Sequence, residues 1–338
     1  MSNYRTGNDY WVAIGQEYTS ETNINAGYGT GKVLKSGEPT WVRFKLFPDK
    51  LEIGGERATI DTGHKTLSGI PTPADKVLGN YNYTLTLSGI LTSEHEILLK
   101  MFNFDYYDDD KIYKLNNIPE KLPSFVILRV WNEPPDINHK YTVDLFKGAQ
   151  LTKLTISGAS GDVIKYEAIF NITEFERETT YTIAGTKPSA LSIMEKIFNF
   201  GDTSFSLNFG NKTKAKSFSL NFGYEFPDDN TQYMNHLKRK PLIPLRFTGE
   251  INYVNNYHKN GDETVIESDL YYGSLNFNTI RIKNNSIQWR FDFNSQVINY
   301  SLADPDKALF ENNITERLVK LPENEIYPNS DIFIIQII

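Results

Sequence analysis

Length, composition and charge limit what this chain can be. It has 338 residues, 39% apolar and 23% charged, so it is long enough for two ordinary domains and too apolar to be disordered. Its formal net charge of −7 disfavours tight binding to duplex DNA, which normally needs a basic surface. It has no cysteine, which excludes disulfides, thiolate nucleophiles and cysteine-ligated metal centres.

The N-terminal stretch lacks both the basic and the apolar region of a secretory signal. Residues 26–33, AGYGTGKV, match a phosphate-binding loop only in part. Ala26 stands where that motif needs Gly, and Val33 stands where it needs Ser or Thr. We therefore interpret this segment as a surface loop that binds no nucleotide.

Alternation of apolar and polar residues predicts antiparallel strands with one buried and one exposed face. The pattern is clearest in residues 81–87, 164–172 and 287–294. The heptapeptide SFSLNFG occurs at both 204–210 and 217–223, and the polar spacer between the copies predicts a hairpin. Aromatic residues make up 13% of the chain, which also favours strands.

One helix is predicted clearly, over residues 92–102. Ser93 and Glu96 have the spacing of a capping box, in which two side chains satisfy free amides at a helix start. Residues 189–198 are a second candidate, near the middle of the chain. The stretch 227–240 occupies a similar place in the second half. It is shorter and more polar than the first candidate, so a helix there is in doubt.

The sequence offers no recognisable catalytic or metal centre. The acidic stretch 105–111 lacks the spaced ligands, the Gly and the closing Glu of a calcium loop. No GxSxG motif occurs, and paired carboxylates cannot be located among 42 acidic residues. We expect no cofactor and no metal. The histidines, none at metal-ligand spacing, are His64, His95, His139, His236 and His258.

Similar phrases recur in the same order in the two halves, which predicts an internal duplication. The phrases DLFKGAQL and DLYYGSL are the most alike. The matched segments are 83–89 with 217–223, 123–130 with 241–247, 144–151 with 269–275, and 163–171 with 286–294. We therefore expect a mainly β fold of two tandem β-sandwich domains, 10–185 and 186–338, each with about one flanking α-helix. Alternatively, two unrelated β-rich domains share these soft patterns.

The first half resembles the tail tube proteins of long-tailed bacteriophages. The resemblance rests on residues 15–32, 76–102 and 148–172. It implies a β-sandwich with one helix and a long loop or hairpin that reaches neighbouring subunits. Rings of six tube domains stack into a hollow tube in that family, and some members carry two domains in each chain. Three chains of the present protein would then form one pseudo-hexameric ring.

The resemblance also implies a role and partners. We expect a structural virion protein without enzymatic activity, assembled in the host cytoplasm and located in the phage tail. Its partners would be further copies of itself, the tape-measure protein, and the tail terminator and distal tail proteins. DNA would pass through transiently, and no membrane would be involved.

Two groups of residues follow as candidates for this role. Polar residues on the exposed faces of predicted strands are candidates for the lumen lining: Asn82, Thr84, Thr86, Lys165, Glu167, Gln288, Arg290 and Asp292. Three predicted protruding segments are candidates for contacts between rings: 131–140, the hairpin around Asn260-Gly261, and the long segment 48–79. The candidate residues come from the first two: Glu133, Asp136, His139, Asn260, Asp262 and Glu263. A distal-tail or baseplate ring protein, a carbohydrate-binding β-sandwich and a hydrolase with unplaced carboxylates remain alternatives.

Overall fold

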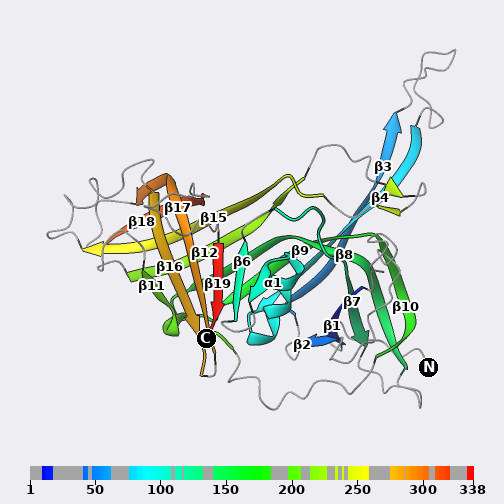
Figure 1. Ribbon diagram of the computed structural model, residues 1–338, viewed down its shortest axis with the longest axis horizontal. Coiled ribbons are helices and arrows are strands. Elements are labelled where there is room, and N and C mark those ends of the chain that lie inside the picture. The colour runs from blue at the N-terminus through cyan, green and yellow to red at the C-terminus, as the bar shows by residue number, and fades with distance from the viewer. Residues whose placement is uncertain are drawn as a thin grey trace.

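The structure is a computed structural model that describes sixteen stretches of the chain. These are residues 10–17, 41–44, 48–61, 76–107, 111–115, 118–131, 140–183, 197–206, 214–226, 233–234, 238–239, 243–258, 275–285, 287–303, 309–319 and 333–338. The prediction of a mainly β fold is confirmed, because antiparallel strands form an open sheet that runs through both halves (Figure 1). None of the described helices is long and apolar enough to cross a membrane.

Ten strands come from the first half. They are β1 (Tyr10–Gln16), β2 (Val42–Phe44), β3 (Lys50–Asp61), β4 (Lys76–Ile90), β5 (Asp105–Tyr107), β6 (Ile112–Leu115), β7 (Phe125–Trp131), β8 (Lys140–Ala159), β9 (Lys165–Ile172) and β10 (Glu174–Thr182). The second half contributes β11 (Ser204–Ser206), β12 (Lys214–Glu225), β13 (Tyr233–Met234), β14 (Lys238–Arg239), β15 (Arg246–His258), β16 (Leu275–Lys283), β17 (Gln288–Ala303), β18 (Leu309–Leu318) and β19 (Phe333–Ile337).

The long strand β8 belongs to two parts of the sheet. Its first part pairs with β7 and β10, and its second part pairs with β9 and β12. The change occurs at Gly148, whose φ of 64° lies in the left-handed region that favours glycine. The first half thus holds the strand orders β1–β7–β8–β10 and β3–β4–β9–β8, with β2 beside β1.

Strand β17 has the same double role in the second half. Its first part pairs with β16 and β19, and its second part pairs with β18. The resulting orders are β11–β16–β17–β19 and β12–β15–β18–β17. A β-bulge interrupts β8 opposite β9 between Leu151 and Lys153, and another interrupts β17 opposite β18 between Val297 and Asn299. The two halves therefore share strand order and bulge position.

This order differs from the one that the matched phrases indicate. Residues 83–89 lie in β4, whereas 217–223 lie in β12, which occupies the position of β3. Residues 163–171 lie in and just before β9, whereas 286–294 include the first part of β17, which occupies the position of β8. The phrases match strands one step out of place, because alternation makes neighbouring strands look alike.

The two halves are joined by strand pairing and by a common core. Strands β8 and β12 pair over seven residues, from Lys153 opposite Gly223 to Ala159 opposite Ser217. Strand β19 pairs with β6, and the hydroxyl of Tyr224 donates a 2.8 Å hydrogen bond to the carbonyl of Phe102. The largest cluster of buried apolar side chains includes residues from both halves. The division at residue 185 stays a prediction.

The predicted helix over 92–102 is confirmed in shorter form. A 3-10 turn, η2 (Ser93–Glu96), leads into α1 (Ile97–Met101), the single α-helix among the described residues. The capping box is formed one residue earlier than predicted, by Thr92 and His95, because the backbone N–H of Thr92 donates to Nδ1 of His95 at 3.0 Å. Buried Leu98, Leu99 and Met101 anchor the helix in the core.

The structure bears on three local expectations, and one of them, the SFSLNFG hairpin, is wrong within the described residues. The described part of the first SFSLNFG copy, Ser204–Ser206, pairs with β16, whereas β12, which contains the second copy, lies between β8 and β15. In 227–240, residues 233–234 and 238–239 form the strand pair β13–β14 and no helix. The end of the candidate helix 189–198 is extended, since Ile197 bridges Thr92. Residues 184–196 lie outside the described residues.

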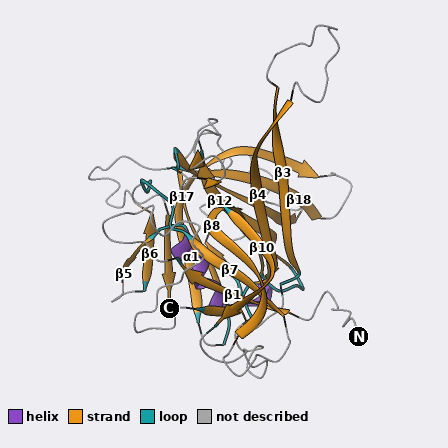
Figure 2. Ribbon diagram, turned by 90° about the vertical axis from the view of Figure 1, so that its right-hand side faces the viewer, coloured by secondary structure: helices purple, strands orange, loops and turns teal. Residues whose placement is uncertain are grey.

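Strands β3 and β4 form a long hairpin that leaves the body of the molecule. They pair from Lys50 opposite Ser88 to Asp61 opposite Lys76. Figures 1 and 2 both show the far ends of the two strands projecting away from the other strands. The near ends belong to the sheet, because Leu85 and Leu87 of β4 are completely buried in the core.

Candidate functional site

The most extensive feature outside the core is the polar face of eight strands, in the order β3–β4–β9–β8–β12–β15–β18–β17. One face of these strands is buried against the common core, for example through Leu85, Phe170 and Leu220. Side chains alternate along each strand, so the residues between these lie on the opposite face. We refer to that opposite face as the polar face.

Strand register aligns polar residues in continuous rows across this face. One row crosses all eight strands: Lys50, Ser88, Glu167, Thr155, Asn221, Glu250, Arg317 and Gln296. A neighbouring row crosses five of the strands: Lys165, Ser157, Ser219, Asn252 and Thr315. The two halves thus contribute to the same polar rows, which cross the β8–β12 junction between them.

Hydroxyl and amide groups on this face hydrogen-bond between strands. The hydroxyl of Thr155 donates to Oδ1 of Asn221 at 2.8 Å, across the boundary between the two halves. The hydroxyl of Thr315 donates to Oδ1 of Asn252 at 2.7 Å. These bonds use the side-chain oxygens of Asn221 and Asn252, so part of the polar capacity of this face is satisfied between strands.

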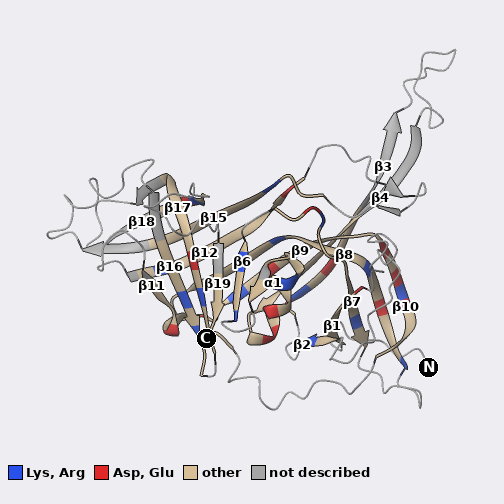
Figure 3. Ribbon diagram, in the orientation of Figure 1, with Lys and Arg blue, Asp and Glu red and all other residues tan. Residues whose placement is uncertain are grey.

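Charges of both signs occur on the polar face. The basic residues are Lys50, Lys153, Lys165, Arg246 and Arg317, and the acidic ones are Glu52, Glu167, Glu225 and Glu250. Nε of Arg246 lies 2.5 Å from Oε2 of Glu225, and this hydrogen bond holds the pKa of Glu225 below its usual value. Figure 3 shows basic and acidic segments interspersed along the strands. The described face therefore has no basic stripe.

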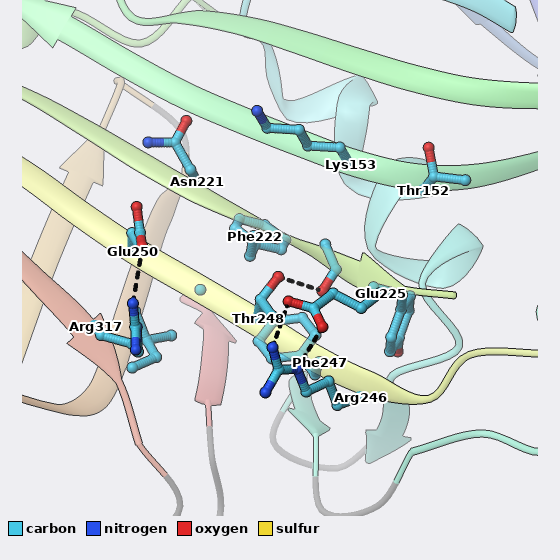
Figure 4. A pocket seen from close by; sticks show the side chains of 14 residues that line it. Thr152, Lys153, Asn221, Phe222, Glu225, Arg246, Phe247, Thr248, Glu250 and Arg317 are labelled. Carbon is cyan, nitrogen blue, oxygen red and sulfur yellow. Dashed lines mark hydrogen bonds and ion pairs between the residues drawn. The ribbon is translucent and has the colours of Figure 1, made fainter. Parts of the chain in front are cut away.

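The middle of the polar face is hollowed. A cavity of about 640 Å³ lies over β8, β12, β15 and the end of β18. Figure 4 shows Lys153 and Asn221 on one side of it and the ion pairs Arg246–Glu225 and Glu250–Arg317 on the other. Phe222 and Phe247 also contribute to the lining. Strands from both halves are needed to form this cavity.

The structure brings four of the predicted lumen residues together. Thr84 and Thr86 of β4 and Lys165 and Glu167 of β9 all lie on the polar face. Asn82 lies in β4, and its side chain is outside the described residues. The sequence contains the same signal for Ser219 and Asn221, since these alternate with buried Phe218, Leu220 and Phe222, although neither is among the predicted lumen residues.

The other three predicted lumen residues lie elsewhere. Gln288, Arg290 and Asp292 are in the first part of β17, which pairs with β16 and β19. Asp292 is only 9% exposed; it accepts a 2.6 Å hydrogen bond from the hydroxyl of Thr279 and forms a 2.9 Å ion pair with Nε of Arg290. The sequence pattern matches 286–294 with 163–171, but the observed strand order puts the first part of β17 beside β16 and β19 and separates it from the polar face.

The predicted inter-ring residues cannot be placed. Glu133, Asp136, His139, Asn260, Asp262 and Glu263 all lie outside the described residues. Within the described part of the chain, no group of three His, Asp or Glu side chains is arranged to hold a metal ion. No protein-family model matches this chain, and no curated protein matches it.

Proposed function

We propose that this protein is a structural protein of a bacteriophage tail, in which chains assemble into rings that stack into a hollow tube for DNA. The observation that carries the proposal is the polar face, which crosses eight strands drawn from both halves. A surface of this kind suits the lining of a water-filled channel. The lining would consist of Thr84, Thr86, Lys165 and Glu167, together with Thr155, Asn221 and their neighbours in the two rows.

The strand orders support two tandem domains within the chain. Each order in the first half has a counterpart of the same form in the second, and both long strands carry a bulge at the same place. Aligned on the bulges, residues 148–157, GAQLTKLTIS, correspond to 294–303, NSQVINYSLA. A chain with two like domains mimics a dimer, so three chains supply the six domains of a pseudo-hexameric ring.

The charges on the polar face support a channel rather than a binding site for DNA. Every Lys or Arg that pairs with a phosphate adds affinity through counterion release, which would hold the duplex in place. Here acidic residues lie among the basic ones, and Arg246 and Arg317 are each paired with a glutamate. Phosphates passing this face therefore meet no continuous row of free cations on its described part.

The β3–β4 hairpin supports assembly. It carries the sheet well beyond the core (Figure 2), and a projecting hairpin of this kind suits a contact with a neighbouring ring. We propose as partners further copies of this chain, the tape-measure protein, and the terminator and distal tail proteins at the ends of the tube. The protein would act in the virion after assembly in the host cytoplasm, without catalysis.

Electron microscopy of the purified protein tests this proposal. We expect hollow filaments built of stacked rings with three-fold symmetry at the level of whole chains. Isolated rings that never stack would instead favour a distal-tail or baseplate part. Discrete monomers at high concentration would overturn assembly, and glycan binding by those monomers would favour a carbohydrate-binding protein.

A further inference from the structure

We propose that successive chains join head to tail, through pairing of the second part of β17 in one chain with β3 of the next. We further propose that the junction copies the register of the β8–β12 junction inside the chain. This inference rests on the proposed tandem organisation. It assigns the interface to two strand edges and predicts which residues face one another.

The internal junction supplies the template. The second part of β8 pairs with β9 along one edge and with β12 along the other. Along the second edge, Ser157 lies opposite Ser219, Ile156 opposite Leu220, and Lys153 opposite Gly223. Ile156 and Leu220 are both completely buried, so the core continues through the junction.

The bulges align β17 with β8. Thr152 stands within the bulge of β8 and Ile298 within the bulge of β17. Counting toward the C-terminus from Thr152 in β8 and from Ile298 in β17, Lys153 corresponds to Asn299, and Ser157 corresponds to Ala303. The partner strands agree, because Lys153 lies opposite Ile169 of β9, and Asn299 lies opposite Thr315 of β18.

The same counting aligns β3 with β12. Thr86 of β4 and Asn252 of β15 lie opposite Ile169 and Thr315, the two positions just matched. Thr86 faces Glu52 of β3, and Asn252 faces Ser219 of β12. Glu52 therefore corresponds to Ser219. One step further, Ile53 corresponds to Leu220, and both are on the core side of their strands.

Both edges lack a partner strand among the described residues. Strand β16 pairs with β17 only as far as Gln296, so residues 297–303 have β18 on one side and no described strand on the other. Strand β3 pairs only with β4 in the described part of the chain. Such edges present unpaired N–H and C=O groups and favour addition of another strand.

Copying the template gives a definite register between chains. The pairs are Ala303 with Glu52, Leu302 with Ile53, Ser301 with Gly54, Tyr300 with Gly55, and Asn299 with Glu56. Because one chain offers β17 and the next offers β3, the contact is heterologous. Each chain keeps one edge available, and the series ends only when a ring closes.

Disulfide cross-linking tests this register. The chain has no native cysteine, so only the introduced cysteines can form a disulfide. In the double variant Glu52→Cys/Ala303→Cys, the two Cα atoms would be about 4.5–5.5 Å apart across the junction, within disulfide range. We expect mild oxidation of the assembled protein to give covalent multimers, up to a closed ring, on non-reducing gels. Reduction should return them to monomer.

The matched control is Glu52→Cys/Asn299→Cys, which moves one cysteine four residues along β17. That displacement is about 13 Å, so we expect little cross-linking. Equal cross-linking of both variants, or none in the first, would overturn the proposed register.

For the unmodified protein, we expect amides of 52–56 and 299–303 to gain protection from hydrogen exchange on assembly. Unchanged exchange there would overturn the interface even if a cysteine variant failed to fold.

The outcomes also separate this inference from the proposed function. Hollow filaments without the Glu52–Ala303 cross-link would leave the tube proposal standing and remove the head-to-tail register. Cross-linked multimers that never form hollow filaments would support the register and remove the tube.

Discussion

Leu220 of β12 lies directly opposite Ile156 of β8, and both side chains are completely buried. The first residue belongs to the second half of the chain and the other to the first half. The strand pair that joins the halves is therefore also part of their common core. Neither half, as described, encloses its apolar residues by itself.

Replacing Leu220 with Ala tests this shared core. We expect a loss of about 2–5 kcal/mol in the free energy of unfolding, because the change removes buried methyl groups and leaves a cavity. Urea denaturation should show one transition, shifted as a whole. Ser219→Ala, on the polar face of the same strand, is the control and should change stability by less than about 0.5 kcal/mol. Two transitions, only one of them shifted, would contradict a common core.

A chain that ends at residue 185 tests how far the first half folds alone. This fragment exposes the β8 edge and removes β12 and β19 from their partners β8 and β6. We expect poor solubility, because an exposed edge beside uncovered apolar residues promotes aggregation. Co-expression with residues 186–338 should restore a soluble complex. If the fragment alone unfolds cooperatively at the stability of the whole chain, the prediction is wrong.

Acid should destabilise the protein through His95. This side chain is 2% exposed and lies between the rings of Phe44 and Tyr166, at centroid distances of 4.3 and 4.2 Å. Burial lowers the pKa of His95 from 6.5 to about 3. The unfolded chain therefore binds the proton more tightly, so the contribution of His95 is complete above about pH 6.5 and is lost as the pH falls toward 3.

The matched variant for this effect is His95→Gln. Glutamine is the usual residue at this position of a capping box, so the helix start is retained. Each pKa unit corresponds to about 1.4 kcal/mol, so we expect the wild type to lose on the order of 5 kcal/mol more than the variant between pH 7 and pH 3. Parallel pH profiles of unfolding free energy for the two proteins would contradict the assignment.

Raising the pH should also destabilise the protein, through Glu316. This carboxyl group is completely buried on β18; Oε1 accepts a 2.6 Å hydrogen bond from the hydroxyl of Tyr253, and Oε2 accepts one from Nδ2 of Asn278 at 2.6 Å. Burial raises the pKa of Glu316 above its usual value of 4.5. The folded state thus holds the proton more tightly, and stability falls as the pH rises above about 4.5.

Glu316→Gln keeps the hydrogen-bonding shape and cannot ionise. We expect the variant to be more stable than the wild type at pH 8 and equal to it at pH 4, measured by thermal melts across this range. Glu167→Gln, on the exposed polar face, is the control for loss of a carboxylate and should change stability by less than about 0.5 kcal/mol. A wild type more stable than Glu316→Gln at pH 8 would show that the charged carboxylate is favoured in the core.

Adding positive charge to the polar face tests the channel. Asn221→Lys places a lysine in the middle of the row that crosses eight strands, and the assembled tube repeats it. We expect filaments that now retain DNA, with binding that weakens steeply as salt increases. Thr180→Lys, on exposed β10, is the control for charge alone. Similar retention by both variants would argue that Asn221 does not line the path of DNA.

Period-two alternation determined the secondary structure wherever the choice was local. It predicted strands over 81–87, 164–172 and 287–294, and the capping residues and apolar stripe predicted the helix near 92–102. It also separated Thr84 and Thr86 from buried Leu85 and Leu87 correctly. These features depend on residues within a few positions of one another, so a short window of sequence contains them.

Only the tertiary structure decided which strands are partners. Alternation states which residues share a face but not which strand lies alongside, so it could not show that β12 lies between β8 and β15 or that Asp292 pairs beside β16 and β19. The bulges at Thr152 and Ile298, the burial of Glu316, and the meeting of Thr155 with Asn221 all depend on residues far apart in the chain. Such contacts are selected by the packing of the whole core, because many strand pairings satisfy the same local pattern and differ in how much apolar surface they bury together.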